Sequence, residues 1–360
     1  MIQIDGSRKS GSGTIVRDAT AFCILRGEGL RVKNIRAKRP KPGLRAQHLK
    51  VLEACARICM GELKGASLGS KEFTFVPSKD IHGGEYRWDI GTAGSTIMLA
   101  LTVIPLAVFA DRASRYRITG GLFQDFAPST FHFQHVLLPI LRRMGVNADV
   151  KIMRPGYVPQ GQGIIQVTVM PAGRKLQPLS LTHQGSVTRT RGVALSSWLK
   201  GRKVSERMTR ECRTVLNPGG YDPKIDILYD DKEKPVYDSP SVQPGAALAL
   251  WAETDTHCLI GADMAGARGR SAEFIGKKAA EHLLEDLHTG ASVDRHLADQ
   301  IIPFAALAQG KSAFRIPGMT AHIEARLWLV EEILGAKTEV QGGLMRIQGI
   351  GYERRKGVIL

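Results

Sequence analysis

Alternating helix and strand patterns predict an α/β (α+β) protein. Segments in which apolar residues recur every three to four positions predict helices, and the shorter apolar runs between them are typical of strands. A chain of 360 residues with 43% hydrophobic residues can bury a large core. At about 100 to 200 residues per domain, this length predicts two or three domains.

The first part of the chain begins with a strand at residues 1–4, and a glycine-containing loop leads from it into a helix. That helix starts at Thr14 and ends at Gly27, which suits the left-handed conformation that closes many helices. The same spacing of apolar residues predicts three further helices, at 44–61, 93–109 and 132–146. Between and after them we expect a turn at 63–69 and strands at 73–77 and 164–171.

A change in composition near residue 180 predicts an inserted domain. Residues 182–213 form a basic unit with a strand-like start and a helical tail, and residues 221–254 alternate strand-like runs with turns rich in Asp, Pro and Gly. A helix follows at 271–290, then helices at 298–310 and 321–335 and a strand-like segment at 340–351. We therefore predict a body of repeated units, residues 1–181 and 288–360, interrupted by an insert at 182–287.

The charge of the chain points to nucleic acid as a partner. Fifty Lys and Arg residues against 34 Asp and Glu residues give a net charge of +16, which attracts polyanions. Five cysteines without a C-x-x-C pair favour neither a disulfide framework nor a zinc site, and we expect a cytoplasmic protein. The start of the chain has no leader pattern, and the apolar run at 99–110 is short and contains a proline, so no membrane role is expected.

The segment from Arg31 to Lys50 contains eight Lys or Arg residues in twenty positions and no Asp or Glu. Pro40, Pro42 and Gly43 exclude an amphipathic membrane helix, and phosphate is the natural partner of such a run. The alternative is a solvated loop.

A second phosphate candidate is the loop at 5–13 (DGSRKSGSG), which offers backbone N–H groups and a helix start, with Arg8 and Lys9 for neutralisation. This loop lacks the spacing of a P-loop or a dinucleotide fingerprint, and glycine-rich turns are often only turns.

Three histidines are candidate functional groups. His322 lies at the start of a helix, where its neutral, nucleophilic form is favoured, although a helix-initial histidine is often a surface residue. His132 and His135 could bind a metal, but the sequence offers no third ligand.

Several motifs together resemble a known family. They are IRAKRPKPGLRAQHL at 35–49, GTAGST at 91–96, FAD at 109–111, GG…AP at 120–128, RPGYVPQGQG at 154–163 and HLADQ at 296–300, followed by His322. In order and spacing they resemble the RNA 3'-terminal phosphate cyclases, and ADMAGARGRSAEFIGKKAAEHL at 262–283 resembles the insert of bacterial members. The resemblance implies repeated βαβαββ-like units similar to the C-terminal domain of translation initiation factor three, with a smaller inserted α/β domain.

The resemblance also implies a reaction. A histidine would attack ATP to give a covalent histidine–AMP, the adenylate would pass to an RNA 3'-phosphate, and the 2'-hydroxyl would close a 2',3'-cyclic phosphate. A divalent metal, expected to be magnesium, would bridge the triphosphate oxygens. ATP versus GTP, the RNA and the oligomeric state, a homodimer included, stay open.

Residue roles follow by the same resemblance. His322 would be the nucleophile, and Asp299 would orient it or bind metal. The side chains that would bind phosphates are three cations and one amide: Arg17, Arg36, Arg39 and Gln47. The expected nucleotide site consists of His296, Leu297, Ala298, Asp299, Gln300, Leu101, Pro128, Ser10 and Thr14. Two of these have plainer interpretations: Gln47 as a helix cap and Arg17 as a helix-surface residue.

The chain departs from the family pattern at several nucleotide contacts. Lys9, Ser10 and Thr14 stand where active members have glycine, an acidic residue and glutamine. Ala325 and Arg326 replace a Thr-Asn pair; Leu101 replaces a glutamine and His296 a tyrosine. The main alternative is therefore an impaired member acting as an RNA-binding or ribosome-assembly factor. The enolpyruvyl transferases, which also repeat such units, are a third interpretation.

Overall fold

Three units with the same order of elements, strand, helix, strand, helix and two strands, make up most of the computed structural model, which describes residues 1–78 and 80–353. The first unit contains β1 (Ile2–Asp5), α1 (Gly13–Arg26), β2 (Leu30–Lys33), α2 (Ala46–Cys59), β3 (Glu62–Lys64) and β4 (Phe73–Val76).

In the second unit a π-helical turn interrupts the second helix, and in the third unit a π-helical turn ends it. The second unit contains β5 (Gly84–Asp89), α3 (Thr96–Val108), β6 (Ser114–Gly120), α4 (Thr130–His132), the π-helical turn Phe133–Leu137, α5 (Leu138–Arg143), β7 (Asn147–Arg154) and β8 (Gly163–Met170). The third contains β9 (Ser180–Leu181), α8 (Leu297–Gln300), α9 (Ile302–Leu307), β14 (Gln309–Arg315), α10 (Ala321–Leu329), the π-helical turn Val330–Leu334, β15 (Lys337–Gln341) and β16 (Leu344–Ile350).

The sheets of the three units share one topology. Their strand orders are β1-β2-β4-β3, β5-β6-β8-β7 and β9-β14-β16-β15. In each sheet the first two strands of the unit are parallel and the remaining pairs are antiparallel. The repetition of units expected from the sequence is therefore present, while their likeness to the C-terminal domain of initiation factor three stays a prediction.

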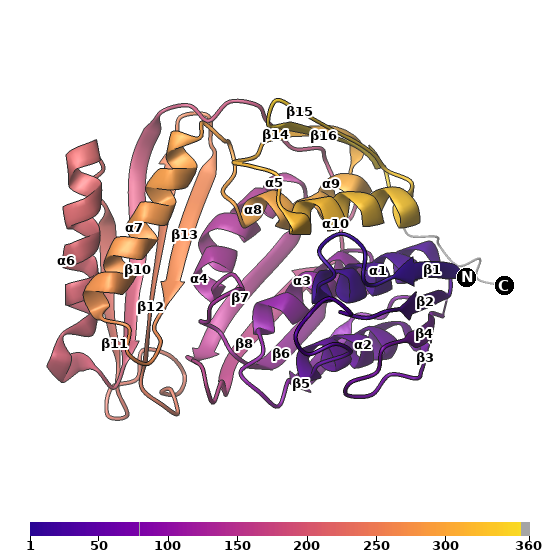
Figure 1. The fold of residues 1–360 in the computed structure, drawn as a ribbon, viewed down its shortest axis with the longest axis horizontal. Helices are drawn as coiled ribbons and strands as arrows, with labels where there is room; N and C mark the ends of the chain where they lie inside the picture. Colours follow the sequence, from indigo (N-terminus) through magenta and orange to yellow (C-terminus); the bar gives the residue numbers. More distant parts are fainter. Residues whose placement is uncertain (79, 354–360) are drawn as a thin grey trace.

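The chain between β9 and α8 forms a fourth sheet with two helices. Its elements are β10 (Val187–Ser197), α6 (Val204–Leu216), β11 (Lys224–Asp230), β12 (Gly245–Thr254), β13 (Leu259–Ala265) and α7 (Ala272–His288), with short 3-10 turns at Lys200–Arg202 and Asn217–Gly219. Figure 1 shows this sheet at the left, with the first unit at the opposite end. The division at 181/182 and 287/288 stays a prediction.

Side chains on β12 alternate between two hydrophobic cores. Ala246, Leu248 and Leu250 pack with α6 and α7, whereas Ala247 and Ala249 belong to the core of the three units. Successive side chains of a strand point to opposite faces, so a continuous apolar run is required where both faces are buried. The insert is thus joined to the body through one face of its sheet.

Helix α1 lies at the centre of the body, packed against α2, α3 and α10 (Figure 1). Every residue from Gly13 to Leu25 is buried, including Arg17 and Asp18. Gly27 closes the helix with φ +69°, as expected. A helix enclosed on all sides has no solvent-facing stripe, so its charged residues need partners inside the protein.

The predicted helices are found, one of them divided into two, but several strands, among them β2, β5, β6 and β7, were not predicted. The segment expected as one helix at 298–310 forms α8 and α9, separated at Ile301, followed by strand β14. Strand β2 was not predicted, because the alternation of Leu30 and Val32 with charged residues lies at the start of the basic run. In the residues that the structure describes, no helix combines the length and apolar character that a bilayer crossing requires.

Candidate active site

Two adjoining cavities of about 260 and 360 Å³ lie where the three units meet. Both are lined by the beginning of α1, by α3, by the loop after β6 and by His322 at the start of α10. The smaller cavity extends toward α8 and the larger one toward the basic segment after β2. We call the two together the candidate catalytic cleft, or the cleft.

His322 lies in the first turn of α10, whose N-terminus is capped by Thr320. Its Nδ1 is 3.1 Å from the hydroxyl oxygen of Thr14 on α1. Burial lowers the pKa of His322, nearby arginines lower it further, and Asp299 opposes the shift. The imidazole is therefore neutral at physiological pH, and its contact through Nδ1 leaves Nε2 as the nitrogen available for attack.

Arg17 is 5% exposed and lies inside the cleft, so the interpretation of Arg17 as a helix-surface residue is wrong. Its guanidinium donates to the hydroxyl of Thr14 at 3.2 Å. Burial lowers the pKa of Arg17 to about 10, and the residue still carries its charge at pH 7. A buried cation next to His322 is suited to bind an anion.

Arg326 on α10 joins two carboxylates beneath the cleft. Its Nε donates to Asp18 at 2.8 Å, and a second guanidinium nitrogen lies 3.1 Å from an oxygen of Asp299. Burial would lower the pKa of Arg326, but the charges of the two carboxylates outweigh burial and raise it. This cluster fixes Asp299 beside His322 and balances both negative charges.

The basic segment supplies three more arginines to the larger cavity: Arg36, Arg39 and Arg45. Arg36 adopts a positive φ of 53°, and its guanidinium donates to the carbonyl oxygens of Lys41 and Gly43 at 2.7 and 3.0 Å. Burial, with repulsion from the other two arginines, lowers the pKa of Arg36. These three arginines therefore line the larger cavity, while phosphate as the partner of the segment stays a prediction.

Gln47 lies within α2 and does not cap that helix, whose N-cap is Arg45. The side-chain oxygen of Gln47 instead accepts from the backbone N–H of Ser95, 3.4 Å away. The next residue, His48, is 3% exposed and also lines the cleft. Burial, reinforced by three arginines, lowers the pKa of His48 to about 3, so it is a neutral ring that accepts the N–H of Arg45 through Nδ1.

The loop before α1 brings a helix N-terminus into the cleft. Ser12 caps α1 by accepting from the N–H of Thr14, and Ser12, Gly13 and Thr14 line the larger cavity. Ser10 does not line either cavity; its hydroxyl bonds that of Ser12 at 2.9 Å. Its carbonyl accepts from Arg39 at 3.5 Å, so Ser10 supports the helix cap and the arginine wall indirectly.

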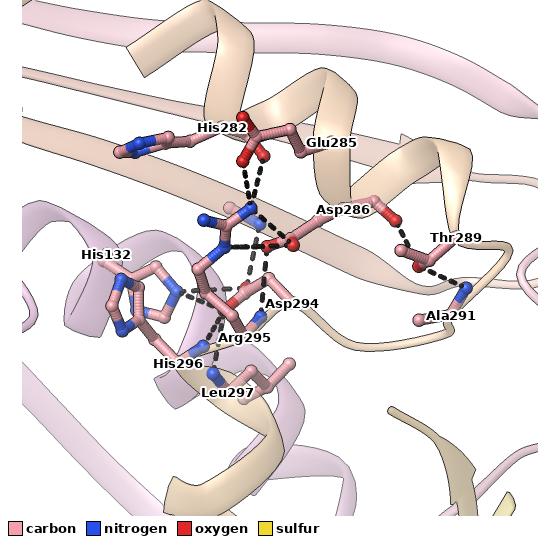
Figure 2. A network of polar contacts seen from close by, with 11 residues as sticks. His132, His282, Glu285, Asp286, Thr289, Ala291, Asp294, Arg295, His296 and Leu297 are labelled. Carbon is pink, nitrogen blue, oxygen red and sulfur yellow. Dashed lines mark hydrogen bonds and ion pairs between the residues drawn. The ribbon is translucent and has the colours of Figure 1, made fainter. Parts of the chain in front are cut away.

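Figure 2 shows how the start of α8 is held. Asp294 accepts from the backbone N–H groups of His296 and Leu297, each at 2.8 Å, and its carboxylate contacts Nε2 of His132 at 3.0 Å. Burial would lower the pKa of His132, but Asp294 outweighs burial and raises it. His132 is therefore a buried partner of a carboxylate. The ring of His135 stacks on that of Trp251, with 4.3 Å between the ring centroids. Neither histidine belongs to a group of three metal-binding side chains in the described residues.

The HLADQ segment presents only part of its side chains to the cleft. His296, Asp299 and Gln300 line the smaller cavity, together with Leu101 and Pro128. Leu297 and Ala298 are fully buried in the core and line neither cavity, because consecutive residues of a helix point to different sides.

The sequence of this chain resembles those of known proteins over most of its length. A sequence model of the family described as RNA 3'-terminal phosphate cyclase matches residues 8–340. The chain belongs to the RNA 3'-terminal phosphate cyclase family. The cyclase of Methanopyrus kandleri is 37% identical over 343 residues, which cover 95% of this chain and 96% of that protein. The cyclase of Archaeoglobus fulgidus is 36% identical over 350 residues, covering 97% and 100%.

A solved structure of the enolpyruvyl transferase NikO from Streptomyces tendae aligns with a TM-score of 0.27 and 15% identity, over 48% of this chain and 33% of that one. That likeness is too low to support any argument about this cyclase-family chain.

Several residues that line the cleft are not candidates from the sequence, among them Arg45, His48 and Phe126. Arg45 and His48 belong to the motif at 35–49, which could have indicated them. Phe126 lies between the GG and the AP of the motif at 120–128, which marks the loop but not the aromatic ring. Asp18 lines neither cavity, and its position next to Arg17 within an otherwise apolar helix was a signal of a buried charge pair.

Proposed function

We propose that this protein converts an RNA 3'-terminal phosphate to a 2',3'-cyclic phosphodiester in an ATP-dependent reaction of the ligase type, through a covalent adenylate on His322. The names of its relatives support the activity, and one contact supports the intermediate: His322 Nδ1 meets the Thr14 hydroxyl at 3.1 Å, at the N-terminus of α1. A helix N-terminus with buried arginines is a binding site for phosphate.

Each step is a displacement at phosphorus. His322 Nε2 attacks the α-phosphorus of ATP, forming a P–N bond as pyrophosphate leaves. An oxygen of the RNA 3'-phosphate then attacks that phosphorus and releases the imidazole. Finally the 2'-hydroxyl attacks the 3'-phosphorus, loses its proton and displaces AMP. Such chemistry depends on positioning and on cations over the phosphate oxygens.

The residues of the cleft divide this work. Arg17 and the N-terminus of α1 face the phosphates next to the nucleophile, while Arg36 and Arg39 contact those on the side of the basic segment. Gln47 positions the start of α3 through Ser95. His296, Leu101 and Pro128 border the smaller cavity, which we assign to the adenosine. The buried side-chain oxygen of Gln300 lacks a hydrogen-bond partner in the described residues, and a bound nucleotide supplies one.

Magnesium belongs to the proposal as a companion of ATP. Asp299 is the cleft carboxylate that fits this role, since a magnesium ion in nucleotide sites commonly takes one or two carboxylates besides the phosphate oxygens. When bound, it would neutralise negative charge on the triphosphate. Arg326, 3.1 Å from Asp299, holds that carboxylate in place.

The test is incubation with ATP labelled at the α-phosphate, followed by mass spectrometry of the modified peptide. We expect an acid-labile AMP on His322 and no label in His322→Asn. His288→Ala, a change at the end of α7 outside the cleft, is the matched control and should label normally. A labelled peptide lacking residue 322 would contradict the covalent mechanism.

The second candidate is an RNA-binding member without nucleotide chemistry. It is favoured by the loop before α1, where Lys9 and Ser10 replace the family's glycine and acidic residue. The double variant Lys9→Gly, Ser10→Glu restores that pattern and should steepen the magnesium requirement of adenylation. Identical magnesium titrations in both proteins would reject compensation by Lys9, and no adenylation in either would support the RNA-binding role.

A further inference from the structure

A larger cavity, of about 750 Å³, lies between the second unit and the insert. One wall is the loop after β7, residues 157–160, and the other is formed by the turn before α6 and by the loop between β13 and α7. None of the elements of the nucleotide chemistry described above lines it. Its function is therefore separate from that of His322.

The charge of this cavity is positive. Its lining includes four arginines, Arg202, Arg207, Arg268 and Arg270, and no Asp or Glu. Arg207 is neutralised by Glu273 at 2.7 Å and Arg270 by Asp125 at 2.9 Å. In the part of the chain that the structure describes, Arg202 and Arg268 have no carboxylate within ion-pair distance. Two uncompensated guanidinium groups in one concave surface attract an anion.

The cavity is connected to the cleft through two consecutive residues. Asp125, which lines the cleft, accepts two hydrogen bonds from the guanidinium of Arg270, at 2.9 and 3.0 Å. Phe126 follows it, with a φ of 63° and a side chain that is fully exposed, 103% of its reference area. Exposed aromatic rings beside basic grooves are the surfaces on which unpaired bases stack.

The walls are held rigidly across the junction. The hydroxyl of Tyr157 contacts that of Ser197 at 3.0 Å, and the amide of Gln243 donates to the Tyr157 carbonyl. A Cβ at Gly245 would lie 2.1 Å from the Tyr157 ring, so the insert approaches this loop as closely as a glycine permits. A preformed site binds without the cost of ordering its walls.

We propose that this cavity binds the sugar–phosphate backbone of the RNA upstream of its reacting 3' end, with Arg202 and Arg268 contacting phosphates and Phe126 stacking a base where the strand leaves the cleft. The inference rests on the proposed function and adds the path of its substrate. Single-stranded RNA is favoured over a folded protein partner because the lining combines uncompensated arginines, an adjoining exposed ring and a direct connection to the site of the 3'-phosphate.

The experiment measures binding of two 3'-phosphorylated oligoribonucleotides, one of about two nucleotides and one of about ten, without ATP and at several salt concentrations. For the long RNA, Arg202→Ala and Arg268→Ala should each weaken binding and reduce the salt slope by about one. Binding of the short RNA should be unchanged. Arg210→Ala, on the same helix as Arg207 but outside this cavity, is the matched control, and Arg268→Lys should recover most of the binding.

Failure of this inference is distinguishable from failure of the proposed function. RNA binding needs no ATP, and adenylation of His322 needs no RNA, so all variants are also tested for adenylation, which should equal that of the parent. Equal affinity of parent and arginine variants for the long RNA would overturn the inference. A loss of ATP affinity with unchanged RNA affinity would overturn it too, by assigning the cavity to a nucleotide.

Discussion

Replacement of Arg326 by methionine tests the buried charge cluster beneath the cleft. Arg326 is 4% exposed and is shared by Asp18 at 2.8 Å and Asp299 at 3.1 Å. Methionine retains an unbranched side chain without the charge, so two carboxylates lose their common partner. Removal of one member of a buried pair costs about 3 to 5 kcal/mol. Because Arg17 still lies close enough to Asp18 to stabilise it, we expect a loss of about 3 kcal/mol in the free energy of unfolding at pH 7.

The assay is urea unfolding at pH 7, followed by tryptophan fluorescence. Arg142→Met is the control, because its pair with Asp149 is exposed and should be worth less than about 1 kcal/mol. The double variant Asp18→Asn, Arg326→Met should recover part of the stability, since an amide needs no counter-charge. A loss below about 1 kcal/mol for Arg326→Met, or no recovery in the double variant, would refute the reasoning.

Three further predictions concern the cleft. Arg39→Ala should lower the rate of single-turnover cyclisation by about 10²-fold with a modest change in RNA affinity. Arg31→Ala is the control, because Arg31 lies in the same basic segment but pairs with Glu72, and it should change neither quantity by much. A loss of RNA affinity without a loss of cyclisation rate would contradict the role of Arg39. The lowered pKa of His322 predicts that the rate of adenylation stays constant from neutral pH to below about 6.5 and declines only at lower pH, as the ring is protonated. Single-turnover labelling whose rate has an inflection above about pH 7 would exclude this. Gly13→Ala places a Cβ 2.0 Å from Nε2 of His48 and should destabilise the protein by about 1 to 3 kcal/mol in thermal unfolding. Combining it with His48→Ala should relieve that cost. Additive effects of the two substitutions would instead show that the positions are independent.

Much of the fold could be predicted because the helices carry strong local signals. The glycine after α1 and the long apolar periodicities placed the central helices within a few residues. Strand β2 was missed because its period of two is confined to four residues, half of them charged. The break between α8 and α9 was missed although Pro303, in the first turn of α9, is typical of a helix start, because the apolar run continues across it.

The candidate site divides in the same way. The basic segment and His322 could be found because each lies within one recognisable stretch of sequence. The partners of Arg326 could not, because both pairs join α10 to residues whose proximity depends on how the three units pack. Arg17 was selected, yet its burial became apparent only from the helices around α1.

The contact between Thr14 and His322 joins residues 308 positions apart, as does the pair of Asp18 and Arg326. At a synthesis rate of about 5 to 20 residues per second, roughly 15 to 60 s separate the emergence of the two halves of each contact from the ribosome. During that interval the arginines of the first unit are present without His322, and the insert has time to fold. The cleft is therefore completed last, so that under the proposed function a nascent chain can associate with RNA before it can modify it.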